Sequence, residues 1–201
     1  VPADHDLGAA RRGGLGPLGL PGVGDGSTID LKLPKVDGLE VLEKVRDAEE
    51  LEHARIDEYR AGVAKAIEYA TALGVGQLNC LAGKAPAGVD PKVLHSTFVS
   101  NLKYTAGEFK KHGLKLLIEP INTFDIPGFF LSTTAQGIAI LDEVGADNAF
   151  LQYDIYHAQR MEGELANSIK KYFNRIAHLQ LADNPGRNEP GTGEINYAYL
   201  F

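Results

Sequence analysis

Three separated segments place acidic or amide side chains at the end of an apolar run. The segments are KLLIEPIN (115–122), AFLQYDIYH (149–157) and AHLQLADNP (177–185), and the polar residues are Glu119, Asp154, Gln180 and Asp183. A buried carboxylate is costly unless it is paired or bound to a metal. Three such strand ends therefore suggest one shared polar site, as in metal-assisted active sites at the C-terminal mouth of a parallel barrel. Carboxylate and amide oxygens favour hard cations, Mg²⁺ or Mn²⁺.

Two of the side chains near these strand ends are weaker signals. Tyr156 and His157 follow Asp154 and could orient a polar substrate, although a single histidine is more often an ordinary surface or core residue. Gln180 and His178 share one face of their predicted strand, so either could turn toward a metal. An imidazole ligand would widen the choice of metal beyond hard cations.

From residue 55 onward, helical patterns alternate with apolar strands. Strands are expected within 77–83, 115–122, 149–157 and 177–185, and helices within 56–74, 91–112, 133–145 and 161–176. The predicted helix starts carry N-cap residues at Asp57, Asp90 and either Ser132 or Thr133, and glycines follow the expected ends at Gly74, Gly113 and Gly145. Near-continuous apolar strands between helices predict a parallel sheet that is covered on both faces.

This α/β pattern fits either an open doubly wound sheet or a (β/α)8 barrel. No G-x-G-x-x-G or G-x-x-x-x-G-K-[ST] motif lies between a predicted strand and helix. The GTGEIN segment follows a strand but lacks the lysine of a phosphate-binding loop. Nucleotide-binding forms of the open sheet are therefore disfavoured.

The chain changes character near residue 54. Residues 1–26 are crowded with glycine and proline, which predicts an irregular or mobile segment because ordering it gains little side-chain burial. Residues 27–33 could form a strand and residues 36–54 an amphipathic helix. We therefore divide the chain into a divergent N-terminal segment, 1–54, and a domain at 55–201.

Composition limits the partners and the compartment. The net charge of −7 argues against nucleic acid as the main partner. The single cysteine, Cys80, excludes an intrachain disulfide and is expected to be an inert core thiol. No apolar run reaches the roughly 20 residues of a membrane span, and no basic-then-apolar leader opens the chain. We predict a cytoplasmic protein with no membrane partner.

Longer motifs resemble a known family. IEPINTFDIPGFFL, QYDIYHAQRMEGEL and HLQLADNPGRNEPGTGEINY resemble the hydroxypyruvate isomerases of the xylose-isomerase-like barrel superfamily, over about residues 55–201. The resemblance implies a partial or altered (β/α)8 TIM barrel and interconversion of hydroxypyruvate and tartronate semialdehyde through an enediol. It implies that Glu119 is one of two acid/base glutamates and that Glu119, Asp154 and Gln180 bind a divalent metal. His157, Asp183, Arg187 and Glu189 would then bind the small hydroxy-keto acid substrate or shape the loop beside it.

The chain also departs from this family. The second catalytic glutamate is expected on a final strand beyond Phe201, and residues 1–54 do not resemble the family's first third, including its H-N-L-P-A-G-D-W motif. We therefore expect weak activity and self-association into homo-oligomers. The alternatives are a 2-oxo-tetronate-type sugar-acid isomerase, a metal-dependent endonuclease of the same superfamily, and an inactive partial barrel.

Overall fold

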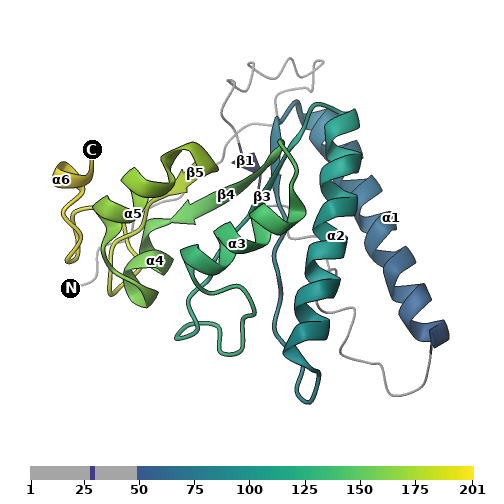
Figure 1. Ribbon diagram of the computed structural model, residues 1–201. Coiled ribbons are helices and arrows are strands. Elements are labelled where there is room, and N and C mark those ends of the chain that lie inside the picture. Colours follow the sequence, from purple (N-terminus) through teal and green to yellow (C-terminus); the bar gives the residue numbers. More distant parts are fainter. Residues whose placement is uncertain (1–27, 30–48) are drawn as a thin grey trace, which may run out of the picture.

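The computed structural model describes residues 28–29 and 49–201, with side chains from residue 55 onward (Figure 1). The predictions of an irregular segment at 1–26 and of a helix over most of 36–54 lie outside the described residues. A short strand, β1 (Thr28–Ile29), falls within the segment predicted as a strand at 27–33.

Within the described residues, the sheet has five parallel strands in the order β1-β2-β3-β4-β5. The other four strands are β2 (Gln77–Asn79), β3 (Lys115–Ile118), β4 (Ala149–Asp154) and β5 (Ile176–Gln180). Every strand pairs with the next strand in the sequence, whereas the strand order of a doubly wound sheet reverses. The prediction of a partial (β/α)8 barrel is therefore confirmed.

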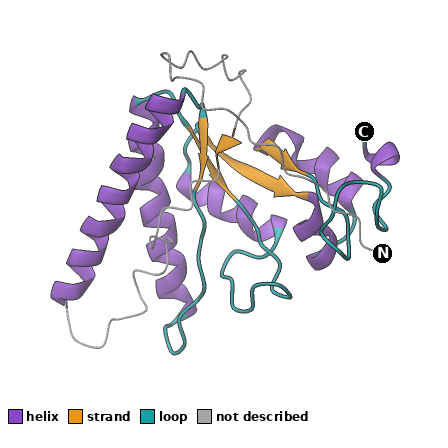
Figure 2. Ribbon diagram, turned by 180° about the vertical axis from the view of Figure 1, so that it is seen from behind, coloured by secondary structure: helices purple, strands orange, loops and turns teal. Residues whose placement is uncertain are grey.

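Helices connect the strands and cover the sheet. They are α1 (Glu49–Leu73), α2 (Pro91–Lys111), α3 (Thr134–Val144), α4 (Ile155–Met161), α5 (Leu165–Tyr172), the 3₁₀ turn η2 (Phe173–Arg175) and α6 (Tyr197–Leu200). Helices α1, α2 and α3 lie side by side in Figure 1, and Figure 2 shows the strands from the opposite side.

Most of the predicted helix ends are confirmed. The Asp90 side chain accepts a hydrogen bond from the backbone N–H of Lys92 at 2.8 Å, and Pro91 takes the first helical position. Of the two candidate caps of α3, Thr133 accepts from the backbone of Gln136 at 3.3 Å. Gly145 ends α3 with φ of 67°, a conformation that glycine adopts without a steric penalty.

Several predicted boundaries are wrong, and the strands expected at 115–122 and 177–185 already end at Ile118 and Gln180. Asp57 does not cap a helix, because α1 begins at Glu49 and no helix-breaking residue interrupts it up to Leu73. The strand predicted over 77–83 ends at Asn79. The strand predicted over 149–157 ends at Asp154, whose side chain caps α4 instead. The predicted division of the chain between residues 54 and 55 falls inside α1, and it stays a prediction.

The core lies between the sheet and its helices. The three residues Leu116, Leu117 and Ile118 of β3 are fully buried, as expected for a strand covered on both faces. Phe98 and Leu102 of α2 are also fully buried, and they belong to one hydrophobic cluster with Leu116 and Ile118. Cys80, predicted as a core thiol, directly follows β2 and is half-buried, with its Sγ 3.5 Å from the hydroxyl of Tyr59. Among the described residues, no helix is both long and apolar enough to span a membrane.

Candidate active site

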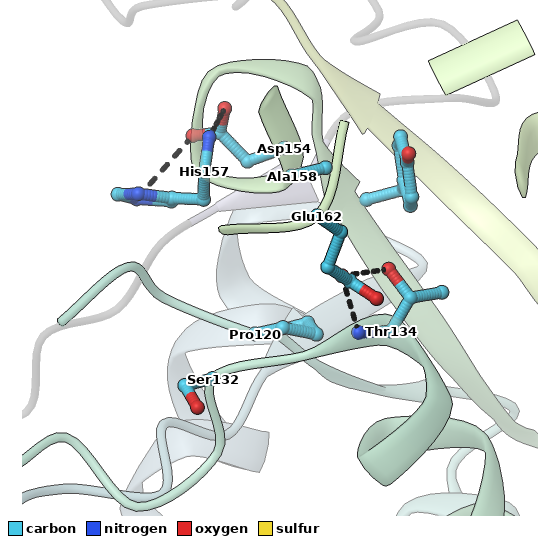
Figure 3. Close-up of a pocket in the computed structure, with 8 residues that line it drawn as sticks. Pro120, Ser132, Thr134, Asp154, His157, Ala158 and Glu162 are labelled. Atoms are coloured by element: carbon cyan, nitrogen blue, oxygen red, sulfur yellow. Dashed lines mark hydrogen bonds and ion pairs between the residues drawn. The ribbon is translucent and has the colours of Figure 1, made fainter. Parts of the chain in front are cut away.

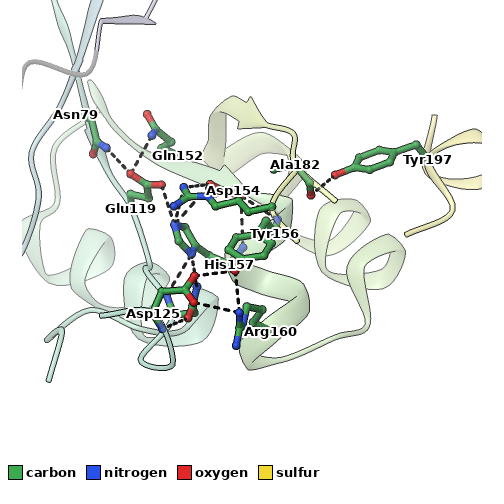
Figure 4. A network of polar contacts seen from close by, with 12 residues as sticks. Asn79, Glu119, Asp125, Gln152, Asp154, Tyr156, His157, Arg160, Ala182 and Tyr197 are labelled. Atoms are coloured by element: carbon green, nitrogen blue, oxygen red, sulfur yellow. Dashed lines mark hydrogen bonds and ion pairs between the residues drawn. The ribbon is translucent and has the colours of Figure 1, made fainter. Parts of the chain in front are cut away.

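Glu119 directly follows β3 and is buried, as its position at a strand end predicts. Its Oε2 accepts hydrogen bonds from Nδ2 of Asn79 at 2.6 Å and from Nε2 of Gln152 at 3.0 Å (Figure 4). Asn79 ends the neighbouring strand β2, and Gln152 lies in β4 on the other side. The two amides fix the plane of the carboxylate, while Oε1 faces His157 at 4.0 Å from its Nε2.

Asp154 ends β4 and divides its two oxygens in the same way. Oδ1 accepts from the backbone N–H groups of Tyr156 at 2.8 Å and His157 at 3.4 Å, so it caps α4. A carboxylate is favourable there because of the helix dipole. Oδ2 lies 3.6 Å from Nε2 of His157 and 3.4 Å from Nη2 of Arg187. One oxygen of Asp154 is therefore structural and the other faces the site.

His157 lies in the first turn of α4, and its ring is buried between the loop after β3 and the two carboxylates. Nδ1 lies 2.7 Å from Nδ2 of Asn122 and 3.4 Å from the backbone nitrogen of Asn122. Burial lowers the pKa of His157, Asp154 opposes this shift, and Arg187 adds to it. The neutral imidazole is therefore the favoured form.

Glu119, Asp154 and His157 form one buried cluster whose ligand atoms lie within 4.8 Å of one another. The predicted convergence of Glu119 and Asp154 is thus confirmed. Two carboxylate oxygens facing one point suit a hard divalent cation. Gln180 ends β5 opposite Asp154 in the strand register and is half-buried, and its role as a ligand stays a prediction.

Asp183 is buried and organises the loop after β5. Its carboxylate accepts from the backbone N–H groups of Asn184 at 3.0 Å, Gly191 at 2.8 Å and Ile195 at 3.0 Å. These backbone hydrogen bonds, that of Ile195 first, lower the pKa of Asp183 although burial opposes them. Gly193 passes so close that an added Cβ would lie 2.1 Å from the backbone oxygen of Asn184. This geometry supports the predicted role of Asp183 in shaping the loop.

The same loop brings Arg187 to the cluster. Its Nη2 lies 3.2 Å from Nε2 of His157, and its guanidinium lies 5.1 Å from the ring centre of Tyr156. Glu189 is exposed, and its backbone oxygen accepts from the hydroxyl of Thr192 at 2.7 Å. Of these two predicted loop residues, Arg187 is the one that contacts the acidic cluster.

A second polar network, centred on Asp125, adjoins the cluster through Asn122 and His157 (Figure 4). Asp125 accepts from Nδ2 of Asn122 at 3.0 Å, from the hydroxyl of Tyr156 at 2.7 Å and from Nη1 of Arg160 at 3.0 Å. The hydrogen bonds from Asn122 and Tyr156 lower the pKa of Asp125. The carboxylate is therefore held ionised beside Asn122.

A small pocket adjoins the cluster (Figure 3). Its lining residues are Pro120, Ser132, Thr134, Tyr153, Asp154, His157, Ala158 and Glu162. Oε1 of Glu162 accepts from both the backbone N–H and the hydroxyl of Thr134, each at 2.7 Å. Glu162 thus links the C-terminal end of α4 to the N-terminal end of α3 by hydrogen bonds. Both residues line the pocket, so these bonds hold one side of it in place.

Sequence reasoning missed five residues of these hydrogen-bond networks: Asn79, Asn122, Asp125, Gln152 and Arg160. A signal exists for two of them. Asn79 and Gln152 are polar residues inside apolar runs, and such residues are costly to bury unless they are hydrogen-bonded. Their partner could not be read from the sequence, because it depends on the register of three strands.

Sequential parallel strands with a buried acidic cluster at their carboxyl ends define a partial (β/α) barrel with a candidate site at its mouth. The chain belongs to the xylose isomerase-like TIM barrel family, whose model matches residues 40–201. It is 57% identical over 147 residues to hydroxypyruvate isomerase from Escherichia coli, covering 73% of this chain and 57% of that protein. The resemblance seen in the sequence motifs is thereby confirmed.

Two further relatives are close. A 2-oxo-tetronate isomerase from Cupriavidus necator is 42% identical over 144 residues, covering 72% of this chain and 55% of that protein. The crystal structure of a family 2 AP endonuclease from Brucella melitensis has a TM-score of 0.71 and 38% identity, covering 73% of this chain and 56% of that one. The chain thus spans little more than half the length of the curated relatives that it matches.

Proposed function

We propose that this chain carries the active-site end of the barrel of a hydroxypyruvate isomerase. Such an enzyme interconverts hydroxypyruvate and tartronate semialdehyde. The observation that carries the proposal is the carboxylate of Glu119, with Oε2 held by two amides and Oε1 directed toward Asp154 and His157. The identity of 57% to the hydroxypyruvate isomerase of Escherichia coli supports this substrate.

The reaction moves protons without a net change in atoms or electrons. A base removes a proton from the hydroxyl-bearing carbon, and the electron pair of that C–H bond forms the enediol double bond. A proton then returns to the former carbonyl carbon, while the hydroxyl proton passes to the former carbonyl oxygen. Glu119 is the proposed proton carrier on one side of the substrate, because its Oε1 faces the centre of the cluster.

The proposed cofactor is Mg²⁺ or Mn²⁺, held by Glu119, Asp154 and Gln180. When bound, the cation would polarise the substrate oxygens and stabilise negative charge on them. Oε1 of Glu119 and Oδ2 of Asp154 fit this role, because their partner oxygens already have structural donors. Arg187 lies where it can neutralise a substrate carboxylate, and we assign substrate binding to Arg187 and His157. Asp183 and Glu189 would act through the loop that carries Arg187.

Two alternatives keep the same site. The identity of 42% to a 2-oxo-tetronate isomerase favours a larger sugar acid as a second candidate substrate. The similarity to the family 2 AP endonuclease makes DNA cleavage a further candidate function. The net charge of −7 disfavours a polyanionic partner such as DNA. Assays on both acids, and a nicking assay on DNA with an abasic site, separate these activities.

The remaining properties are proposals of the same kind. We propose a cytoplasmic protein without a nucleic-acid or membrane partner, and a homo-oligomer. Self-association is supported by the half-exposed strand β5 and by the exposed side chains of Phe173 and Leu181 beside it. Light scattering at several concentrations measures the oligomeric state.

The decisive test is isomerase turnover of the 201-residue chain with added Mg²⁺ or Mn²⁺. We expect turnover that requires the metal and that disappears in Glu119→Gln. Lys65→Gln is a matched surface control, because Lys65 is exposed and pairs with Glu68 on α1. No metal-dependent turnover of either acid would reject the isomerase proposal for this chain and favour an inactive partial barrel.

A further inference from the structure

Among the described residues, two hydrogen-bonding groups reach Nδ1 of His157, and both are donors from Asn122. The backbone nitrogen of Asn122 lies 3.4 Å from Nδ1, with its hydrogen directed at the ring. The side-chain Nδ2 of Asn122 lies 2.7 Å from the same atom. A nitrogen that faces two N–H groups accepts, so it carries no proton. The proton of the neutral ring then lies on Nε2.

The direction of the Asn122 amide is itself fixed. The Oδ1 of Asn122 accepts from the backbone N–H of Asp125 at 2.8 Å, and its Nδ2 donates to Oδ2 of Asp125 at 3.0 Å. Turning the amide over would place oxygen against the carboxylate and an NH₂ group against a backbone N–H. Asp125 is in turn held by Tyr156 and Arg160. The donor that faces His157 is therefore set by the whole network.

One contact favours the opposite tautomer. Nη2 of Arg187 lies 3.2 Å from Nε2, and an arginine can only donate. Its side chain is 49% exposed, however, and it has an alternative acceptor in Oδ2 of Asp154 at 3.4 Å. An exposed side chain moves at little cost, whereas the backbone N–H of Asn122 cannot be reoriented. The contacts at Nδ1 therefore decide the tautomer.

We propose that Asn122, oriented by Asp125, is a positioning residue that keeps His157 neutral with its proton on Nε2. His157 is then a hydrogen-bond donor toward the centre of the cluster, where Glu119 Oε1 lies at 4.0 Å and Asp154 Oδ2 at 3.6 Å. An Nε2 that carries a proton has no lone pair for a metal, so His157 is not a ligand although it lies in the cluster. If the proposed isomerase function holds, this N–H donates to a substrate oxygen that becomes negative during enolisation.

The first measurement is the ring ¹⁵N spectrum of the metal-free chain labelled with ¹⁵N-histidine. Long-range ¹H–¹⁵N correlations distinguish the two neutral tautomers, and His157→Gln identifies the signals of His157. We expect an unprotonated Nδ1 and a protonated Nε2, and the same pattern after Mg²⁺ is added. A proton on Nδ1 in the free chain, or loss of the Nε2 proton with Mg²⁺, would overturn the proposal.

The variants test the role of the network. In Asn122→Asp, a carboxylate oxygen replaces the donor, so the proton should move toward Nδ1. Asp125→Asn should release the Asn122 amide and give a mixture of tautomers. Asp142→Asn is the matched control, because Asp142 pairs with Arg175 on the surface, and it should leave the spectrum unchanged. If both Asn122→Asp and Asp125→Asn keep the wild-type tautomer, the proposal is contradicted. If neither variant folds, the spectra of the wild-type chain with and without Mg²⁺ decide the proposal.

Activity provides a second readout. Loss of an orienting partner typically lowers activity by about 10–100-fold, and we expect this loss for Asp125→Asn. Mg²⁺ should still raise the thermal stability of this variant, because Asp125 is not a proposed metal ligand. The spectra do not depend on turnover. The expected tautomer without isomerase activity would therefore reject the proposed function alone, whereas the opposite tautomer in an active isomerase would reject the positioning role alone.

Discussion

Nδ2 of Asn79 lies 2.6 Å from Oε2 of Glu119, although 40 residues separate the two in the sequence. Together with Gln152, Asn79 occupies one oxygen of the glutamate and leaves the other facing the acidic cluster. Asp154 shows the same division, with Oδ1 capping α4 and Oδ2 facing the site. In each carboxylate, structural donors on one oxygen fix the direction of the other.

Replacing Asn79 tests how firmly Glu119 is held. Asn79→Ala removes a hydrogen bond to a buried carboxylate, and such bonds contribute about 1.5–3 kcal/mol. We expect a loss of that size in the free energy of unfolding, measured with urea. Asn167→Ala is the control, because Asn167 is exposed and bonds to Glu164 at the surface. A loss no larger than that of the control would show that Asn79 does not hold Glu119.

Replacing Glu119 tests its role as a proton carrier. Glu119→Gln keeps an oxygen for the amides of Asn79 and Gln152 but cannot accept a proton near neutral pH. We expect turnover to fall by about 10²–10⁴-fold while the circular dichroism spectrum is unchanged. Turnover near that of the wild type would remove Glu119 from the acid–base chemistry.

Metal binding should appear as thermal stabilisation. A ligand at about 100 times its Kd stabilises the folded state by roughly 2.7 kcal/mol, so Mn²⁺ should raise the Tm. In Asp154→Asn, the amide oxygen can still cap α4 while an NH₂ group replaces the oxygen that faces the site. We expect the fold to persist and the Mn²⁺ effect to disappear. An equal rise of Tm in the variant would place the metal elsewhere.

Two glycines give opposite predictions for alanine. In Gly193→Ala, the Cβ would lie 2.1 Å from the backbone oxygen of Asn184, so the loop around Asp183 must shift and the Tm should fall. Gly107 lies exposed in α2 with no atom within 4 Å of an added Cβ. Gly107→Ala should therefore stabilise the chain by up to about 1 kcal/mol. A Gly193→Ala variant as stable as the wild type would show that the loop does not pass so closely.

Asp183 should make stability depend on acid pH. Its pKa is lowered in the folded chain, so its ionised form stabilises the fold above the ordinary aspartate value of about 3.9. This contribution is lost as the pH falls through the lowered pKa. We expect Asp183→Asn to be less stable than the wild type near neutral pH, with the gap closing below about pH 3.9. The exposed-residue variant Asp57→Asn should differ little from the wild type throughout, and a constant gap for Asp183→Asn would contradict the prediction.

The alternation of strands and helices can be predicted from the sequence, because burial and capping are local patterns. Asp90 and Gly145 were identified as helix ends from residue type alone, and both lie there. Glu119 and Asp154 were identified as site residues because a carboxylate after an apolar run needs a partner. Parallel strands then bring their carboxyl ends to one edge.

How these carboxylates are held depends on the three-dimensional arrangement of the strands. Asn79 and Gln152 meet Glu119 through the register of three strands, which no local pattern specifies. Local patterning also extended the strand of Asp154 to residue 157, because the short helix α4 begins on an apolar residue without a break in the sequence. That helix turns His157 toward Asn122, 35 residues away. Contacts across such separations depend on backbone geometry, and they decide which atom of each side chain faces the site.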